Sequence, residues 1–254
     1  MDIFEDPIDD HSYRDGNMQV SPLSPFKNDR RINMTFEKTK QNTVQRVPKR
    51  AVYDRETVHR LFDQAWFCHV GFVGEFGPTN IPMFHARIDN QIIFHGATTS
   101  RLMTGLASGA PICLSVAMVD GLVLARSLFH HSLNYRSAVA FGHGRAIIDE
   151  ETRWKAFQAI ADKVMPGRWE DARRPNDMES KATLICAVQI ESASAKIRTG
   201  GPNDDDEDHE LDVWAGVIPI QEQLLSPVVD PVSKREIPAP VYLETFRNHM
   251  NRLK

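Results

Sequence analysis

Cysteine is scarce in this sequence, which contains three in 254 residues, Cys68, Cys113 and Cys186. They are too few and too widely spaced for a disulfide framework or a zinc site. Each lies in an apolar, strand-like run, where a small buried thiol is the ordinary interpretation. The cysteine usage therefore favours a reducing, cytoplasmic setting.

Long apolar runs and an excess of positive charge are absent as well. No run approaches the roughly 20 residues that a membrane-spanning helix needs. The acidic start MDIFEDPIDD lacks the apolar centre of a signal peptide. The formal net charge is −4, so the bulk charge does not draw the chain to nucleic acid or to an anionic membrane. We expect neither as a partner.

Several motifs of catalysis and binding are missing. There is no glycine-rich Rossmann or P-loop pattern, so neither kind of nucleotide site is predicted. There is also no nucleophile elbow, no HExxH zinc motif and no carboxylate pair at a defined spacing. The acidic run Asp204–Glu210 predicts a solvated loop, with metal binding as the second interpretation, because nothing fixes its carboxylates. We expect no bound metal.

Composition divides the chain into three parts. Residues 1–45 mix Asp, Asn, Ser, Pro and Lys without an apolar period, which predicts a disordered tail. Residues 46–220 carry periodic apolar segments and predict one domain with a real core. Residues 221–254 are rich in proline and predict an extension that ends in a charged, helical tail.

The domain alternates strand patterns with short helices. Asp54 and Asp149 are placed to cap helices with apolar residues at helical spacing, and a third helix is expected over 100–107 with Thr99 as its cap. Asp89-Asn90 is suited to a two-residue hairpin loop. Strands are expected at 66–73, 81–88, 91–95, 111–119, 135–148, 183–191 and 194–199, and residues 214–220 are expected to be ordered again after the acidic loop.

Two strands have informative details. The run 111–119 is almost continuously apolar, so we expect it to be buried on both faces. Gly142 and Gly144 lie inside the long strand 135–148 and predict bends where a barrel closes. Together the elements predict a mainly β fold with peripheral α-helices, with six or seven strands in a closed or nearly closed barrel.

The segment Phe94–Arg101 carries the clearest binding signal. A strand ends, Gly96 permits a tight turn, and Thr98, Thr99 and Ser100 precede Arg101 in the first turn of a helix. Helix N-termini favour phosphate, and an arginine fork can hold two phosphate oxygens. Without further support, the same residues also fit a plain helix cap.

Histidines offer a second set of candidates. His85 and His95 lie in expected strands, where a core or barrel-lining imidazole is the ordinary interpretation and a catalytic role the alternative. The pair His130-His131 and His143 raise the possibility of haem. Adjacent strand histidines point to opposite faces, so they rarely chelate one metal.

The order and spacing of these segments resemble the pyridoxamine 5′-phosphate oxidase-like superfamily, and within it the flavin-nucleotide-binding branch that includes nitroimidazole reductases. The resemblance covers roughly residues 49–220. It is carried by Lys49-Arg50, the strand–turn–strand Ile81–Phe94, His95–Arg101, Asn134–Val139 with Gly142, and the late segments Ala195–Gly200 and Val213–Pro219.

This resemblance implies a homodimeric split β-barrel that binds two molecules of flavin mononucleotide (FMN) in clefts between the subunits. Ser100 and Arg101 match the family's phosphate clamp. The other candidate cofactor-binding residues are Met83, Phe84 and His85 beside the flavin ring, His95, Thr98 and Thr99 before the clamp, Arg136 and Ser137 from the next strand, in part from the partner subunit, and Trp214 near the ring.

One departure bears on the substrate. The true oxidases carry a lysine directly after the Ser-Arg pair, and here that position is Leu102. The oxidases' C-terminal substrate-binding arginine pattern is also not evident. These differences argue against pyridoxamine phosphate as the substrate, but not against FMN.

The expected function is an FMN-dependent oxidoreductase that passes electrons from NAD(P)H to a small acceptor of the nitroaromatic or quinone type. In such enzymes the cofactor supplies the redox chemistry, and His85 or His95 is the candidate proton donor. The alternatives are a haem-binding or haem-degrading split barrel, and a non-catalytic FMN-binding redox sensor or store. A deazaflavin in place of FMN is a lesser alternative.

Overall fold

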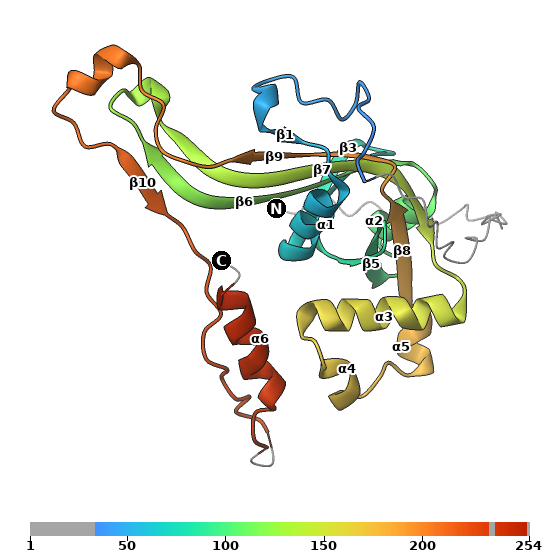
Figure 1. Ribbon diagram of the computed structural model, residues 1–254. Coiled ribbons are helices and arrows are strands. Elements are labelled where there is room, and N and C mark those ends of the chain that lie inside the picture. The colour runs from blue at the N-terminus through green and yellow to red at the C-terminus, as the bar shows by residue number, and fades with distance from the viewer. Residues whose placement is uncertain (1–33, 234–236, 253–254) are drawn as a thin grey trace, which may run out of the picture.

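The computed structural model describes residues 34–233 and 237–252. In this part of the chain, antiparallel strands form one branched sheet with helices at its periphery (Figure 1). The expected mainly β fold is confirmed. The strands are β1 (Ala51–Val52), β2 (Phe67–Gly74), β3 (Gly77–Phe84), β4 (Ala86–Ile88), β5 (Gln91–Ala97), β6 (Pro111–Leu124), β7 (Ser132–Ala146), β8 (Thr183–Gln189), β9 (Ser192–Arg198) and β10 (Gly216–Pro219).

Helices cover the ends and one side of the sheet. None of those in the described ranges is both long and apolar enough to cross a membrane. The α-helices are α1 (Arg55–Gln64), α2 (Arg101–Ala107), α3 (Glu150–Val164), α4 (Arg168–Asp171), α5 (Asp177–Ala182) and α6 (Val241–Arg252), and the 3-10 helices are η1 (Pro48–Arg50), η2 (Leu128–His130) and η3 (Asp206–Glu210).

The helix starts follow the expected capping chemistry. The Asp54 carboxylate accepts a hydrogen bond from the Thr57 N–H at 2.8 Å, and Asp149 accepts one from Thr152 at 2.9 Å. At α2 the cap is Ser100, one residue later than expected. The asparagine-containing hairpin is also confirmed, with Asp89 at φ 51° between β4 and β5.

The strand predictions need two corrections. The expected strand 81–88 is interrupted at His85, which separates β3 from β4. Strand β6 is not buried on both faces: Leu114 and Val116 point into the core, whereas Ala117 and Val119 on the other face are exposed. An apolar run does not distinguish a doubly covered strand from one whose outer face is apolar.

The prediction that residues 1–45 form a disordered tail is wrong for the part that the structure describes. Residues 1–33 lie outside the described residues, but residues 34–45 pack against the domain. Phe36 is buried in the core. The Asn42 side chain donates hydrogen bonds to the carbonyls of Glu37 at 2.8 Å and Ala193 at 3.2 Å. Phe36, the Asn42 amide and backbone hydrogen bonds to Tyr53 and Arg55 together hold this polar segment.

Strand β7 is shared between two parts of the sheet. Its residues 135–141 pair with β9, and its residues 144–146 pair with β8. The change of partner falls at Gly142 and Gly144, where a β-carbon would lie 1.8 Å from the Gln189 carbonyl oxygen and 2.2 Å from that of Leu106. Only glycine allows these approaches, so the predicted bends are confirmed.

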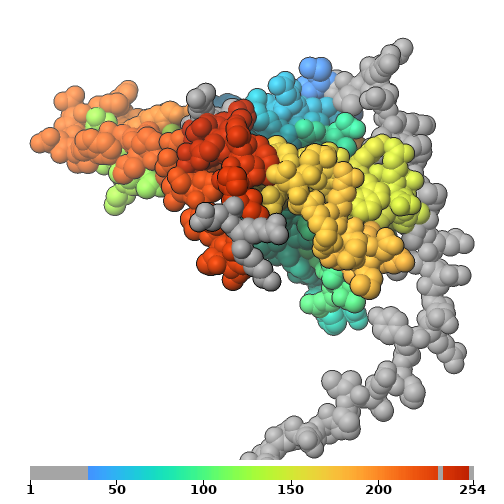
Figure 2. Space-filling model, turned by 90° about the horizontal axis from the view of Figure 1, so that it is seen from below, coloured from blue at the N-terminus to red at the C-terminus, as the bar shows by residue number. Residues whose placement is uncertain are grey.

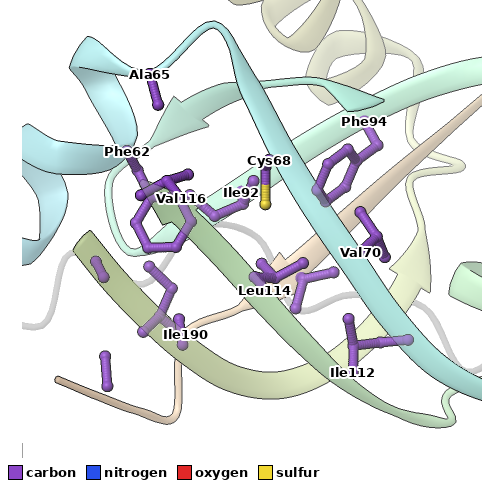
Figure 3. Packing of buried hydrophobic residues seen from close by; sticks show 14 of the residues in the cluster. Phe62, Ala65, Cys68, Val70, Ile92, Phe94, Ile112, Leu114, Val116 and Ile190 are labelled. Atoms are coloured by element: carbon purple, nitrogen blue, oxygen red, sulfur yellow. The ribbon is translucent and has the colours of Figure 1, made fainter. Parts of the chain in front are cut away.

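Two hydrophobic cores lie on opposite sides of β5. The larger one fills the barrel between α1, α2 and the strands, and Figure 3 shows Phe62, Val70, Phe94 and Leu114 pointing toward one another within it. The smaller one lies under α3 and includes Ile93 of β5, the residue directly before Phe94. The alternation along β5 therefore ties the barrel to the helical layer.

The far half of the β6–β7 hairpin extends beyond the barrel as an arm. Strands β9 and β10 accompany it, and η3 lies at its tip (Figure 1). Figure 2 shows the arm as a projection, with the C-terminal segment lying beside the helices around α4. The Tyr242 hydroxyl of α6 donates a hydrogen bond to Asp171 of α4 at 2.6 Å.

The glycine contacts of β7 give a first prediction. Gly142→Ala places a methyl group against the Gln189 backbone, and we expect unfolding in urea to show a loss of about 2–3 kcal/mol or more. The matched control is Gly201→Ala, because a β-carbon there meets no atom within 4 Å; its change is expected within about 0.5 kcal/mol. Equal effects of the two substitutions contradict the close approach.

Candidate functional site

The loop between β5 and α2 presents an uncompensated cation. Thr98 and Thr99 are exposed, and the Ser100 hydroxyl accepts a hydrogen bond from the Met103 N–H at 3.4 Å. The exposed Arg101 guanidinium lies 5.8 Å from the ring centroid of Phe76, and no acidic side chain of the described residues pairs with it. Hydroxyls and an arginine fork at one edge form a suitable surface for a phosphate group.

His95 lies on β5, three residues before Thr98. The side chain is half-buried, and its Nδ1 atom is buried without a hydrogen-bond partner among the described residues. Burial lowers the pKa of its imidazole. An unpartnered ring nitrogen near the Thr98–Arg101 loop keeps His95 as a candidate contact for a bound group.

His85 occupies a different environment from the one expected for a proton donor. Its ring is 1% exposed and packs between Phe62 and Phe94. The Nε2 atom lies 2.8 Å from the Phe62 carbonyl oxygen, to which it donates. Burial lowers the pKa of His85 to about 4, so the imidazole is neutral at pH 7. The structure places this residue in the core.

A second group of expected site residues gathers around Arg136 of β7. A β-bulge in β6 leaves Asp120 unpaired between Val119 and Gly121 and aims its side chain at Arg136, as bulges commonly do. The two carboxylate oxygens accept hydrogen bonds from Arg136 at 2.8 and 2.7 Å, and Gln64 accepts a third at 2.5 Å. Arg136 is thus already held in the isolated chain.

The remaining candidates are placed by the strands. Met83 packs against the barrel core, and Phe84 packs against the core under α3. The Ser137 hydroxyl donates to the Lys196 carbonyl oxygen at 3.3 Å. Trp214 is 66% exposed and lies on the arm just before β10, against Gly216.

One chain does not bring all these residues together. Arg101 lies beside Phe76, at the tip of the β2–β3 hairpin, whereas Met83 and Phe84 lie at the opposite end of β3. Seven residues of strand separate the two ends, about 23 Å. The phosphate-type loop and the Arg136 group therefore belong to two different ends of the molecule.

Sequence reasoning missed an exposed apolar face on β2 and β6. Phe67, His69 and Val73 are exposed along β2, which alternates with buried residues at its start, and Ala117 and Val119 are exposed on the neighbouring strand β6. Phe67 is 59% exposed and Val73 75%. The alternation of residues 67–73 is visible in the sequence. Only the structure shows that the intervening residues are buried, and therefore that Phe67 and Val73 face solvent.

The histidines that suggested haem are mostly engaged. His130 Nε2 lies 3.1 Å from Asp205, and His143 Nδ1 lies 2.8 Å from Glu191. His131 Nδ1 lies 3.1 Å from the Ser127 carbonyl oxygen. Within the described residues, the ligand atoms of His130, Asp205 and Asp208 lie within 4.8 Å of one another at the exposed arm tip, an arrangement that is common without an ion.

A barrel whose long strand β7 is shared between two parts of the sheet places this chain in the class of split β-barrel proteins. The chain belongs to the pyridoxamine 5′-phosphate oxidase family, whose model matches residues 54–197. The family resemblance seen in the sequence is thereby confirmed. No curated protein sequence matches the chain significantly.

Two solved structures share both fold and sequence with this chain. The flavocytochrome Anf3 from Azotobacter vinelandii is 36% identical, with a TM-score of 0.78, over 82% of this chain and 97% of its own. The FAD and heme binding protein from Mycobacterium smegmatis is 34% identical, with a TM-score of 0.74, over 78% and 97%.

The core position of His85 gives a pH prediction. Its folded-state pKa of about 4 lies below the ordinary 6.5, so the unfolded chain binds a proton that the folded chain does not. Stability is therefore complete above pH 6.5 and falls as the pH drops toward 4, by up to about 3 kcal/mol. Urea unfolding of the wild type and of His85→Gln, which keeps a donor for Phe62, measures this contribution.

The comparison must be made across the same pH range for both proteins. We expect the loss between pH 7 and pH 4.5 to be clearly smaller in His85→Gln. An identical loss in the two proteins contradicts the assignment of His85 as a buried, neutral histidine.

Proposed function

We propose that this protein is a flavin-binding redox protein that acts as a homodimer. The observation that carries the proposal is the free Arg101 guanidinium beside exposed hydroxyls at the end of β5, at the position that matches the family's phosphate clamp. The names of the two similar structures, a flavocytochrome and an FAD and heme binding protein, support a flavin as the ligand.

The proposed ligand of this loop is the ribityl-linked phosphate, which FMN and FAD have in common. The sequence resemblance favours FMN, whereas the M. smegmatis protein is named for FAD. When bound, the flavin supplies the electron-transfer chemistry, and the protein binds and orients it. Arg101 and Ser100 hold the phosphate, and His95 offers a ring nitrogen close by. His85 has no part in this proposal, because it is enclosed in the core.

The homodimer follows from the separation of the site residues. A flavin held by Arg101 of one copy reaches the Arg136 end only if a second copy brings that end to it. Arg136, Ser137 and Trp214 are thus assigned to the second copy. The exposed apolar face with Phe67 and Val73 is the surface proposed to be buried between the copies.

For the reaction, we propose NAD(P)H as the donor and a small nitroaromatic or quinone as the acceptor. A non-catalytic flavin protein is the competing proposal. Oxidation of NAD(P)H by the flavin-loaded protein in the presence of such an acceptor distinguishes them, because a store or sensor does not turn over.

Substitution of Arg101 tests the phosphate contact. Arg101→Ala removes a two-pronged, charge-assisted contact, and such hydrogen bonds contribute about 1.5–3 kcal/mol each. We expect FMN affinity, measured by flavin fluorescence, to fall roughly ten- to several-hundred-fold. Arg101→Lys is expected to recover only part, because an ammonium group lacks the fork.

Riboflavin is the matched ligand control, because it lacks the phosphate. Its affinity is expected to stay within about twofold of wild type in both variants. Arg60→Ala, an exposed arginine of α1, is the matched protein control. Equal losses for FMN and riboflavin show damage to the fold, and unchanged FMN affinity in Arg101→Ala rejects the clamp.

The mass of the protein in solution tests the second copy. We expect a dimer at micromolar concentration, with an interface above the roughly 1,000 Å² typical of biological contacts. Phe67→Lys places a charge on the exposed apolar face and is expected to shift light-scattering mass toward the monomer and to release flavin. A flavin-loaded monomer contradicts the shared site.

Haem is a second proposed cofactor, on the strength of His69. This imidazole is exposed on β2 between Phe67 and Val73, and no hydrogen bond within the described residues engages either ring nitrogen. Histidine is a common axial ligand of haem iron and needs an unengaged ring nitrogen for this role. Both similar structures carry haem in their names, as flavocytochrome or heme binding protein.

Absorption spectra test the haem ligand separately from the flavin. We expect the purified protein, supplied with haemin, to show a Soret band that shifts or disappears in His69→Ala while absorption near 450 nm is retained. His143→Ala, whose ring pairs with Glu191, is the control and is expected to leave the band unchanged. A Soret band insensitive to His69→Ala excludes this residue as the ligand.

A further inference from the structure

A polar groove of about 570 Å³ lies away from the Arg101 loop, between η1, the end of β9 and η2. The pairing of β1 with β9 creates it: Ala51 lies opposite Lys196, so the residues just before β1 run alongside the last residues of β9. In Figure 1 the segment before β1 lies directly over β9. Residues far apart in the sequence therefore form one basic wall, with Lys49, Arg50 and Arg198.

Arg198 is a buried cation without an acidic partner. Its side chain is almost enclosed, since the residue is 6% exposed. The guanidinium donates to the Asn134 amide oxygen and to the carbonyls of Gly200 at 3.2 Å and Gly201 at 2.9 Å. Its Nε atom has no partner within the described residues. A buried charge that meets only neutral oxygens is a costly arrangement.

Arg50 and Lys49 add charge of the same sign. Burial, and after it the neighbouring charge of Arg50, lower the pKa of Arg198. Val47, just before η1, has φ 54°, a left-handed conformation that is rare for a β-branched residue. Val47, Lys49 and Arg50 all line the groove, so this turn of the backbone forms part of its wall.

The acidic residues nearby do not neutralise this wall. Asp204 is enclosed and accepts hydrogen bonds from the Arg126 N–H and guanidinium at 2.8 and 3.0 Å. Asp205 faces His130. Among the described residues no Asp or Glu lines the groove itself, whereas Ser132 and Thr199 contribute hydroxyls.

We propose that this groove binds a phosphate group of a nucleotide, held by Arg50 and Lys49 at its mouth and by the buried Arg198 at its base. The guanidinium of Arg50, the ammonium group of Lys49 and hydroxyl donors are groups that recognise phosphate oxygens, and the buried Arg198 adds positive charge beneath them. The volume suits a nucleotide-sized ligand. The site is separate from the Arg101 loop and does not rest on the flavin proposal. The phosphate can come from a diphosphate or from the 2′-phosphate of NADPH.

Calorimetric titration of the full-length protein with inorganic pyrophosphate tests the site. We expect Arg50→Gln to weaken the binding of pyrophosphate by about tenfold or more, since one charge-assisted contact is lost. Arg46→Gln, an exposed arginine four residues earlier that does not line the groove, is the matched control and is expected to stay within about twofold of wild type.

Two further ligands distinguish the sources of the phosphate. A preference for NADPH over NADH that is lost in Arg50→Gln assigns the 2′-phosphate. Equal binding of the two nicotinamide nucleotides, with ADP weakened in parallel with pyrophosphate, assigns a diphosphate. Pyrophosphate that does not bind at millimolar concentration, or that binds equally well to Arg50→Gln and wild type with both proteins folded, overturns the proposal.

Discussion

The contact of the β7 backbone with β8 and α2 is the constraint on which the rest of the structure depends. At Gly142 and Gly144 no side chain fits between the strand and its neighbours, so β7 can leave β9 and join β8. This change of partner closes the barrel and fixes α2 against it. It also sets the distance between the loop that carries Arg101 and the end of β7 that carries Arg136, and so leaves the proposed flavin site divided between two copies.

Local signals in the sequence predicted most elements correctly. Capping residues located α1 and α3, the positive-φ residue Asp89 located a hairpin, and the two glycines located the bends. What failed depends on packing between distant segments. The one-sided burial of β6 is decided by what covers its outer face. The packing of residues 34–45 depends on Phe36, which enters a core assembled from the whole domain, and on Asn42, which reaches the distant Ala193 carbonyl.

For the candidate site, too, the sequence indicated the local features but not the contacts between distant segments. Arg101 stands at a strand-to-helix junction, which is a local feature, and the structure leaves its charge free. The core position of His85 agrees with the ordinary interpretation of a histidine in an apolar strand pattern, whereas its hydrogen bond to the distant Phe62 carbonyl is not visible in the sequence. The carboxylate on Arg136 comes from a bulge in β6, and the groove at Arg198 exists only because β1 pairs with β9. Such contacts between distant residues are set by the register of the sheet.

Identification of the cofactor released from the native protein tests the central claim most directly. Heat or acid frees a noncovalent ligand, and its mass distinguishes FMN, FAD and a deazaflavin in one experiment. The account predicts a flavin nucleotide, FMN or FAD, at one per chain. Protein that carries no flavin, takes none up from solution, or yields riboflavin without phosphate contradicts it.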